Sequence, residues 1–128
     1  VVNPAAIPPS LVGFARQVIH KALQNPHLLD TLLGESLTEP KGQVWFESTD
    51  GVADLSGGAQ LDRRTKMMYD AQHVFINGES FKVRGKDAGV MRLLADDRSI
   101  SGAQVQRLSV DAHEALLDWA SEGWLRAR

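Results

Sequence analysis

The residues best suited to metal chemistry are four scattered histidines, His20, His27, His73 and His113. None of them begins a His-x-Asp pair, which would supply two ligands of a facial iron site. His113-Glu114 resembles the start of the zinc-protease helix motif, but Leu117 stands where the second histidine is required. The chain has no cysteine, so thiolate metal sites and disulfides are excluded. We predict no metal-binding residue here and interpret the histidines as surface or packing residues.

Other catalytic patterns are also incomplete. Gly57-Gly58 is not followed by the Lys-Ser/Thr of a phosphate loop, and no serine lies in a Gly-x-Ser-x-Gly turn. Asp96 and Asp97 are adjacent, so their carboxylates point apart, which favours a solvated helix end over acid–base catalysis. We therefore predict no catalytic and no cofactor-binding residue in this chain.

The charge pattern bears on nucleic-acid binding. Basic residues gather around the predicted strands, at Arg63, Arg64, Lys66, Lys82, Arg84 and Lys86. The predicted helix 109–122 carries no Lys or Arg but four acidic residues, Asp111, Glu114, Asp118 and Glu122. A helix that enters the major groove would bring these carboxylates towards phosphates. The pattern favours a protein-packing domain over a nucleic-acid-binding one.

Composition indicates neither a nucleic-acid partner nor a membrane partner. The net charge of −2 supplies no general attraction to nucleic acid or acidic lipid. No apolar run approaches the roughly 20 residues that span a bilayer, and the first residues lack the pattern of a signal peptide. The first residue is not Met, which suggests an interior piece of a longer protein. We expect a cytoplasmic location and no membrane partner.

Residues 1–41 are predicted to form a helical segment. Ser10 is placed as the cap of a first helix, and Asn25-Pro26 ends it and starts a second. Apolar residues recur at three- and four-residue spacing along both helices. Two short helices cannot hide so many apolar side chains against each other, so we predict a homodimer interface. Its residues are Leu11, Phe14, Val18, Leu28, Leu29, Leu32 and Leu33.

Residues 42–59 are predicted to be a linker, with a short strand at 44–46, and residues 60–128 a second domain. Asn77-Gly78 after an apolar run is the strongest two-residue hairpin signal. Asp87, Ser101 and Ser109 are placed as caps of three later helices, and Gly123 ends the last one before a final strand. The strands of 60–83 are expected to join that strand in one sheet.

The predicted fold class is therefore α+β: an N-terminal helical pair followed by a winged-helix-like domain with a small antiparallel sheet. Its order of elements is helix, short link, helix, tight turn, helix and strand.

Residues 9–41 resemble the helical segment that follows the catalytic cupin in bacterial JmjC-domain, cupin-4-type proteins. Val44-Trp45-Phe46, the 75–79 hairpin and the closing pattern 116–125 are similar to that family as well. The family includes the ribosomal-protein arginine hydroxylases, oxygenases (dioxygenases) that depend on Fe(II) and 2-oxoglutarate. The resemblance covers the chain from about Ser10 to its end.

The resemblance implies an order of catalytic barrel, helical dimerisation region and C-terminal winged helix. The iron and cosubstrate ligands of the family belong to the barrel, so none is carried over to this sequence. The chain is thus expected to be a non-catalytic dimerisation and interaction region of an oxygenase that hydroxylates a ribosomal protein. Expected partners are a second copy, the parent's barrel and the ribosomal protein substrate. The alternative is a free-standing winged-helix regulator that binds nucleic acid.

Overall fold

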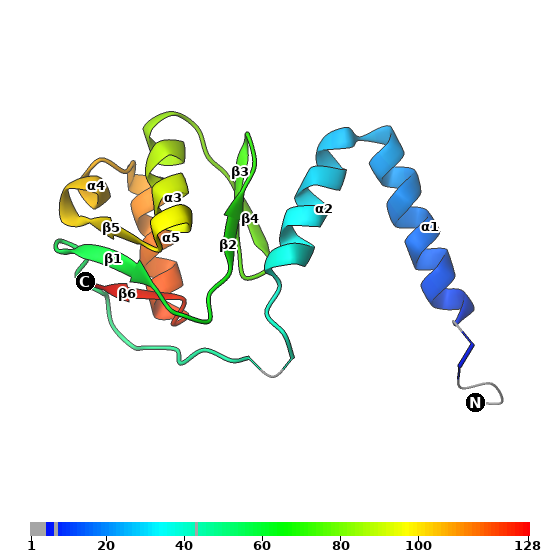
Figure 1. Ribbon diagram of the computed structural model, residues 1–128, viewed down its shortest axis with the longest axis horizontal. Helices are drawn as coiled ribbons and strands as arrows, with labels where there is room; N and C mark the ends of the chain where they lie inside the picture. Colours follow the sequence, from blue (N-terminus) through cyan, green and yellow to red (C-terminus); the bar gives the residue numbers. More distant parts are fainter. Residues whose placement is uncertain (1–4, 7, 43) are drawn as a thin grey trace. The chain divides into compact units, whose positions relative to one another are not determined.

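The computed structural model describes residues 5–6, 8–42 and 44–128. Residues 1–4 and 7 of the predicted 1–41 segment, and residue 43 of the predicted linker, lie outside the described residues. The chain consists of two compact units, which we call the helical unit (Val1–Leu33) and the mixed unit (Gly34–Arg128) (Figure 1).

The helical unit contains helix α1 (Pro9–Gln24) and most of helix α2 (Pro26–Thr38). Pro8, not Ser10, occupies the cap position of α1, so the predicted cap is wrong. Proline at the first helical position has a helix-compatible φ and no N–H to satisfy, so the helix begins before Ser10 and needs no side-chain cap. The break at Asn25 is confirmed: Asn25 is extended, and its side-chain oxygen accepts a hydrogen bond from His27 N at 3.1 Å.

The mixed unit contains two three-stranded antiparallel sheets. The first has the order β5-β1-β6, from β1 (Gly58–Leu61), β5 (Ser99–Ser101) and β6 (Leu125–Ala127). The second has the order β2-β3-β4, from β2 (Met67–Tyr69), β3 (His73–Ile76) and β4 (Glu79–Lys82).

The single sheet expected for the strands of 60–83 and the final strand is therefore wrong, because only β1 pairs with β6. A turn between β1 and β2 separates the two sheets. In this turn Thr65 N donates to Asp62 O, and Arg64 N donates to Asp62 Oδ1, both at 2.9 Å. The strand expected at 44–46 is also absent, since these residues form a loop.

Local signals set the hairpin and two of the helix starts. Asn77 and Gly78 have φ values of 48° and 90°, as the tight turn between β3 and β4 requires. Ser101 caps α4 (Gly102–Gln106) in a capping box with Gln104, and Ser109 caps α5 (Val110–Ser121). Gly123 follows α5 with φ 82°. These predictions are confirmed.

The start of α3 (Gly85–Asp97) differs from the prediction. Arg84 holds its cap position, and Asp87 lies inside the first turn. The Asp87 carboxylate accepts hydrogen bonds from Ser109 N at 2.9 Å and Ser109 Oγ at 2.6 Å. Asp87 was expected to act on its own helix, but it ties the start of α3 to the start of α5.

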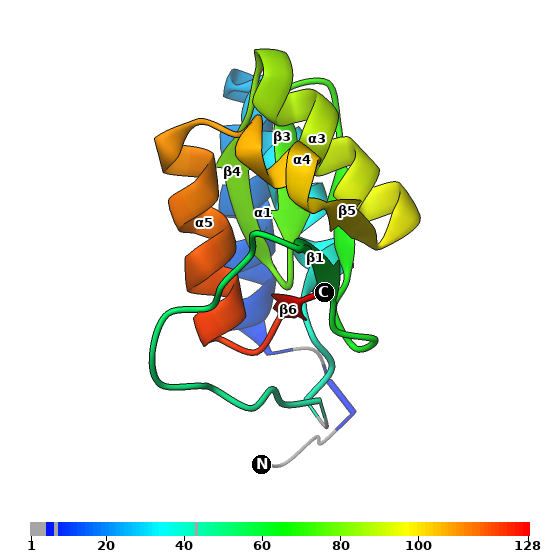
Figure 2. The same ribbon diagram turned by 90° about the vertical axis from the view of Figure 1, so that its left-hand side faces the viewer.

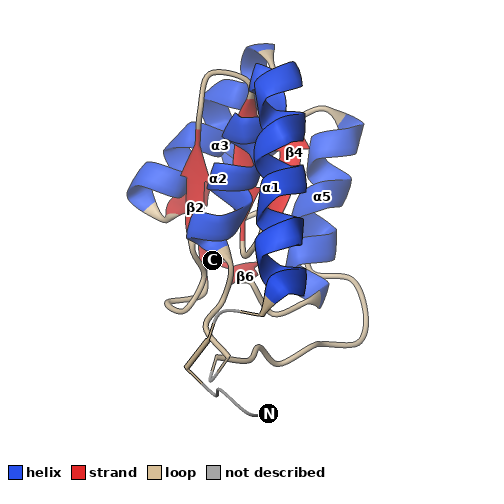
Figure 3. Ribbon diagram, turned by 90° about the vertical axis from the view of Figure 1, so that its right-hand side faces the viewer, coloured by secondary structure: helices blue, strands red, loops and turns tan. Residues whose placement is uncertain are grey.

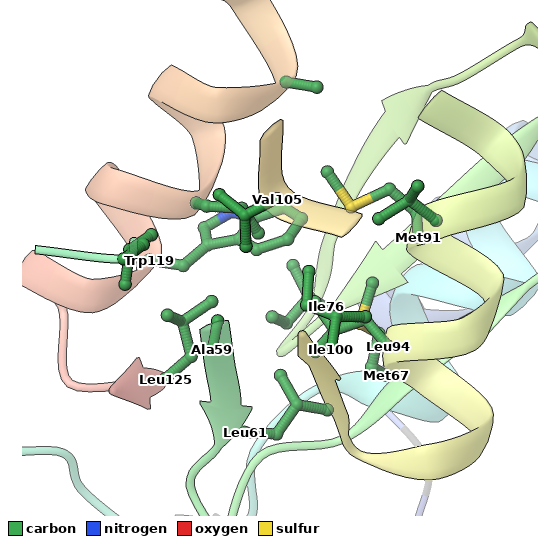
Figure 4. Close-up of a cluster of buried hydrophobic side chains, with 14 of the residues drawn as sticks. Ala59, Leu61, Met67, Ile76, Met91, Leu94, Ile100, Val105, Trp119 and Leu125 are labelled. Atoms are coloured by element: carbon green, nitrogen blue, oxygen red, sulfur yellow. The ribbon is translucent and has the colours of Figure 1, made fainter. Parts of the chain in front are cut away.

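A single apolar core lies between the sheets and helices of the mixed unit (Figure 4). Ile76 and Met67 from the second sheet meet Ile100 of the first sheet and Leu94 of α3. Trp119 of α5 fills the side nearer Ala59 and Leu125. These side chains are almost completely buried, which explains how short strands of three or four residues are held in place.

The last turn of α2 belongs to the mixed unit and packs on the second sheet. A Cβ atom at Gly34 would collide with the Phe75 ring, so only glycine allows this close approach. Thr38 is fully buried; its hydroxyl donates to Gly34 O at 2.9 Å and accepts from Gly78 N at 3.0 Å. Ser80 Oγ donates to Glu35 Oε1 at 2.7 Å. The hairpin turn is thus fixed to the helix end.

Candidate functional site

The seven residues predicted to form a dimer interface all lie on the two helices α1 and α2. Four of them are exposed: Leu11 by 56%, Phe14 by 64%, Leu29 by 55% and Leu33 by 57%. The other three, Val18, Leu28 and Leu32, are half-buried. Ile19 and Leu23 are exposed as well and widen the apolar surface of α1. Self-association through this surface stays a prediction.

The acidic residues of α5 line a groove between this helix and β4. Asp111, Glu114, Asp118 and Glu122 recur at spacings of three and four residues, so they share one helix face, and all are exposed. Glu79 of β4 adds a fifth carboxylate to the lining. The four helix residues could be identified from the sequence, but Glu79 could not, because only the hairpin places that strand beside α5.

Aromatic side chains also line the groove. The Phe81 and Trp119 rings meet edge to face, with centroids 5.3 Å apart, and Trp124 is also part of the lining. Trp119 is buried, whereas Phe81 and Trp124 are half-buried. The groove has a volume of about 530 Å³, which lies within the range of ligand pockets.

Among the basic residues near the strands, Arg64 has a structural role. Its guanidinium pairs with the Asp62 carboxylate at 2.9 Å, donates to Trp45 O at 3.1 Å and lies over the Phe46 ring. The hydrogen bond from Arg64 lowers the pKa of Asp62 and raises the pKa of Arg64. This side chain holds the 44–46 loop, so it adds little to a basic surface for nucleic acid.

The histidines do not come together. On α1, the His20 ring nitrogen Nε2 lies 3.1 Å from Gln24 Nε2. His27 is exposed on α2. His73 is buried against the Phe75 ring, with Nδ1 3.3 Å from Asp70 Oδ1. Within the described part of the chain, no group of three or more His, Asp or Glu side chains could hold a metal ion. These residues therefore do not fit a facial iron site.

The two acidic residues at the end of α3, Asp96 and Asp97, lie on the surface. Both are exposed, and the Tyr69 hydroxyl donates to Asp96 Oδ2 at 2.9 Å. This hydrogen bond raises the pKa of Tyr69. Asp96 is therefore a surface partner of β2, in keeping with the solvated helix end that the sequence predicts. None of the helices in the described ranges is long and apolar enough to cross a bilayer.

Solved structures share this fold at low sequence identity. A structure of YcfD, titled a ribosomal oxygenase from Escherichia coli, aligns with a TM-score of 0.69 and 12% identity over 98% of this chain and 37% of that chain. Another E. coli YcfD structure aligns with a TM-score of 0.68 at 11% identity, over 98% and 36%. A third, titled a complex with cobalt and 2-oxoglutarate, has a TM-score of 0.64 at 12% identity, over 98% and 37%.

This chain thus spans little more than a third of the length of those proteins. No curated protein sequence matches it. A family model described as "ROXA-like winged helix" matches residues 21–126, which is most of the chain; the match begins within α1 and ends within β6. The chain therefore belongs to the ROXA-like winged-helix family.

Proposed function

We propose that this chain is the non-catalytic dimerisation and protein-interaction region of a JmjC/cupin-type oxygenase that uses Fe(II) and 2-oxoglutarate to hydroxylate a ribosomal protein. The match of the family model to residues 21–126 carries the proposal. The structural neighbours support the activity of the parent, because their titles name a ribosomal oxygenase in complex with cobalt and succinic acid and in complex with cobalt and 2-oxoglutarate. Cobalt is a divalent metal that can occupy an iron site.

The metal and the cosubstrate are assigned to a separate barrel. The described residues form two three-stranded sheets and contain no cluster of metal ligands. The contribution of this chain to the reaction is then to assemble the oxygenase and to help hold its substrate. A cytoplasmic location follows from the proposed ribosomal substrate.

Within this role, residues 1–41 serve dimerisation, residues 42–59 are a linker and residues 60–128 are the winged-helix-like domain. The exposed leucines and Phe14 of the helical unit support self-association. Each such side chain would gain about 1.5–3 kcal/mol if a partner covered it. An isologous two-fold dimer is the commonest way to cover the same surface on both copies. The parent's barrel is the other partner.

The acidic face of α5 argues against the nucleic-acid-binding alternative. Asp111, Glu114, Asp118 and Glu122 would approach phosphates if this helix entered a groove. We therefore expect affinity for duplex DNA or RNA no better than the non-specific range, roughly 10⁻⁴ to 10⁻⁶ M at physiological salt.

Two experiments test the proposal. The reading frame upstream of residue 1 is expected to encode a barrel-sized segment with a His-x-Asp pair and a later histidine. A start codon at residue 1, with nanomolar, sequence-selective DNA binding, would support the regulator instead.

Sedimentation of the unaltered chain at tens of micromolar is expected to show a dimer. A monomer with both helices folded would mean that their apolar surface serves another contact.

A further inference from the structure

The groove between α5 and β4 carries more negative charge than the fold needs. In the views of Figures 2 and 3, β4 lies beside α5, and the contact of Phe81 with Trp119 joins them. Among the described residues, none of the five carboxylates that line this groove forms an ion pair or accepts a side-chain hydrogen bond. Their charge is therefore available to a partner.

This arrangement works against the stability of α5. Asp111 and Glu114 are three residues apart, and Glu114, Asp118 and Glu122 follow at four-residue spacing, so each carboxylate repels the next. The last turn has no basic residue, although positive charge is favoured at that end of a helix. Only Asp111, in the first turn, is favourably placed. A surface that costs stability in this way is typical of a binding site.

The groove also offers the surfaces that a guanidinium or ammonium group prefers. Phe81 and Trp124 are half-buried in its lining, and aromatic faces attract cations within about 6 Å. Exposed carboxylates and half-buried aromatic rings in one lining can bind the charged end and the apolar stem of Arg or Lys together.

We propose that this groove docks a Lys/Arg-rich peptide segment of a partner protein. Charge complementarity identifies the occupant, because phosphates of nucleic acid or lipid would meet five carboxylates. The lining continues along α5 towards the start of α3, where Lys82, Arg84 and Asp87 give mixed charge. The basic residues of the segment therefore lie over the part of α5 that carries Glu114 and Asp118. This inference rests on the proposed interaction role and names the chemistry of its partner.

Fluorescence anisotropy of the 128-residue chain with a short labelled peptide that alternates arginine and glycine tests the inference. The variant that combines Glu114→Gln and Asp118→Asn removes two charges from the groove and is expected to weaken binding about tenfold. The matched control combines Asp96→Asn and Asp97→Asn, which remove two exposed charges from the end of α3, outside the groove. The control is expected to keep the affinity within about twofold.

Stability provides a second readout. The groove variant is expected to resist denaturant slightly better than the unaltered chain, because repulsion along α5 is relieved. Equal loss of binding in the groove variant and the control would show attraction to net charge alone and overturn the inference. Binding of duplex RNA or DNA that competes with the peptide, or no binding of the peptide, would overturn it as well. Sedimentation of the same samples separates the two proposals, since the groove variant should still form dimers.

Discussion

In the mixed unit, Leu94 and Leu116 are completely buried, whereas in the helical unit Leu11 and Leu29 are 56% and 55% exposed. The mixed unit closes a core from two sheets and three helices, and its loops are tied by hydrogen bonds such as Thr49 N to Ser121 O. The helical unit has side chains of the same kind but too few elements to enclose them. Similar apolar side chains thus close a core in one unit and stay exposed in the other, where we propose that a partner covers them.

The largest expected effect comes from placing charges on the apolar surface of the helical unit. The combined change Phe14→Asp and Leu29→Asp is expected to weaken self-association by at least about a thousandfold. Two large side chains would lose roughly 2 kcal/mol of burial each, and two carboxylates would be buried. Sedimentation equilibrium measures the loss. Tryptophan fluorescence should show an unchanged unfolding transition, because Trp45, Trp119 and Trp124 all lie in the mixed unit.

A matched pair of leucine truncations sharpens the contrast in burial. Leu94→Ala in the core is expected to reduce the free energy of unfolding by about 3 kcal/mol, within the usual range for buried leucine. Leu23→Ala on α1, where the side chain is 79% exposed, should change it by less than about 0.5 kcal/mol. Urea denaturation followed by tryptophan fluorescence and circular dichroism measures both. Similar losses would contradict the division into a closed and an open unit.

Two threonines of α2 test where the mixed unit begins. Both hydroxyls donate to a carbonyl four residues earlier, but only Thr38 also accepts a hydrogen bond, from Gly78 N. Thr38→Val leaves that half-buried N–H without its protein partner and is expected to cost about 1 kcal/mol. Thr31→Val should cost less than about 0.5 kcal/mol. If the two variants denature alike, the last turn of α2 is not fixed to the hairpin.

The smallest expected effect is a pH dependence confined to the mixed unit. The hydrogen bond from Arg64 lowers the pKa of Asp62 in the folded chain, so the unfolded chain binds the proton more readily. The stability that this carboxylate adds is present above its unfolded pKa of about 3.9 and is lost as pH falls through the lower folded value. Asp62→Asn should therefore reduce the loss of stability between neutral pH and about pH 3. Denaturation midpoints at the two pH values, which should differ less in the variant, provide the measurement.

Elements set by local chemistry could be predicted from the sequence. Asn77-Gly78 allows positive φ at both turn positions, and Ser101 and Ser109 supply oxygens to the first turns that they precede. Such signals need only neighbouring residues, so the fold class, the hairpin and the last two helices followed from them. The acidic face of α5 followed from its spacing in the same way.

Features that join distant residues could not be predicted. Asp87 looked like a cap, but its partner Ser109 is 22 positions away. The partition of the strands into two sheets depends on which short strands meet across the core, and strands of three residues carry too little pattern to specify it. The groove is lined by Glu79 and Phe81 of β4 as well as by residues of α5. Only the folded hairpin brings β4 and α5 together, so the sequence alone did not show this lining.

The hydrogen bond from Gly78 N to Thr38 makes one amide proton a reporter on the whole region. The amide at the tip of a tight turn ordinarily exchanges with solvent deuterium quickly, because local fraying exposes it. Here the proton is released only when the last turn of α2 leaves the hairpin, so its exchange rate measures how often that contact opens. A partner that binds either element and steadies the contact would slow this exchange, even when it touches neither Thr38 nor Gly78.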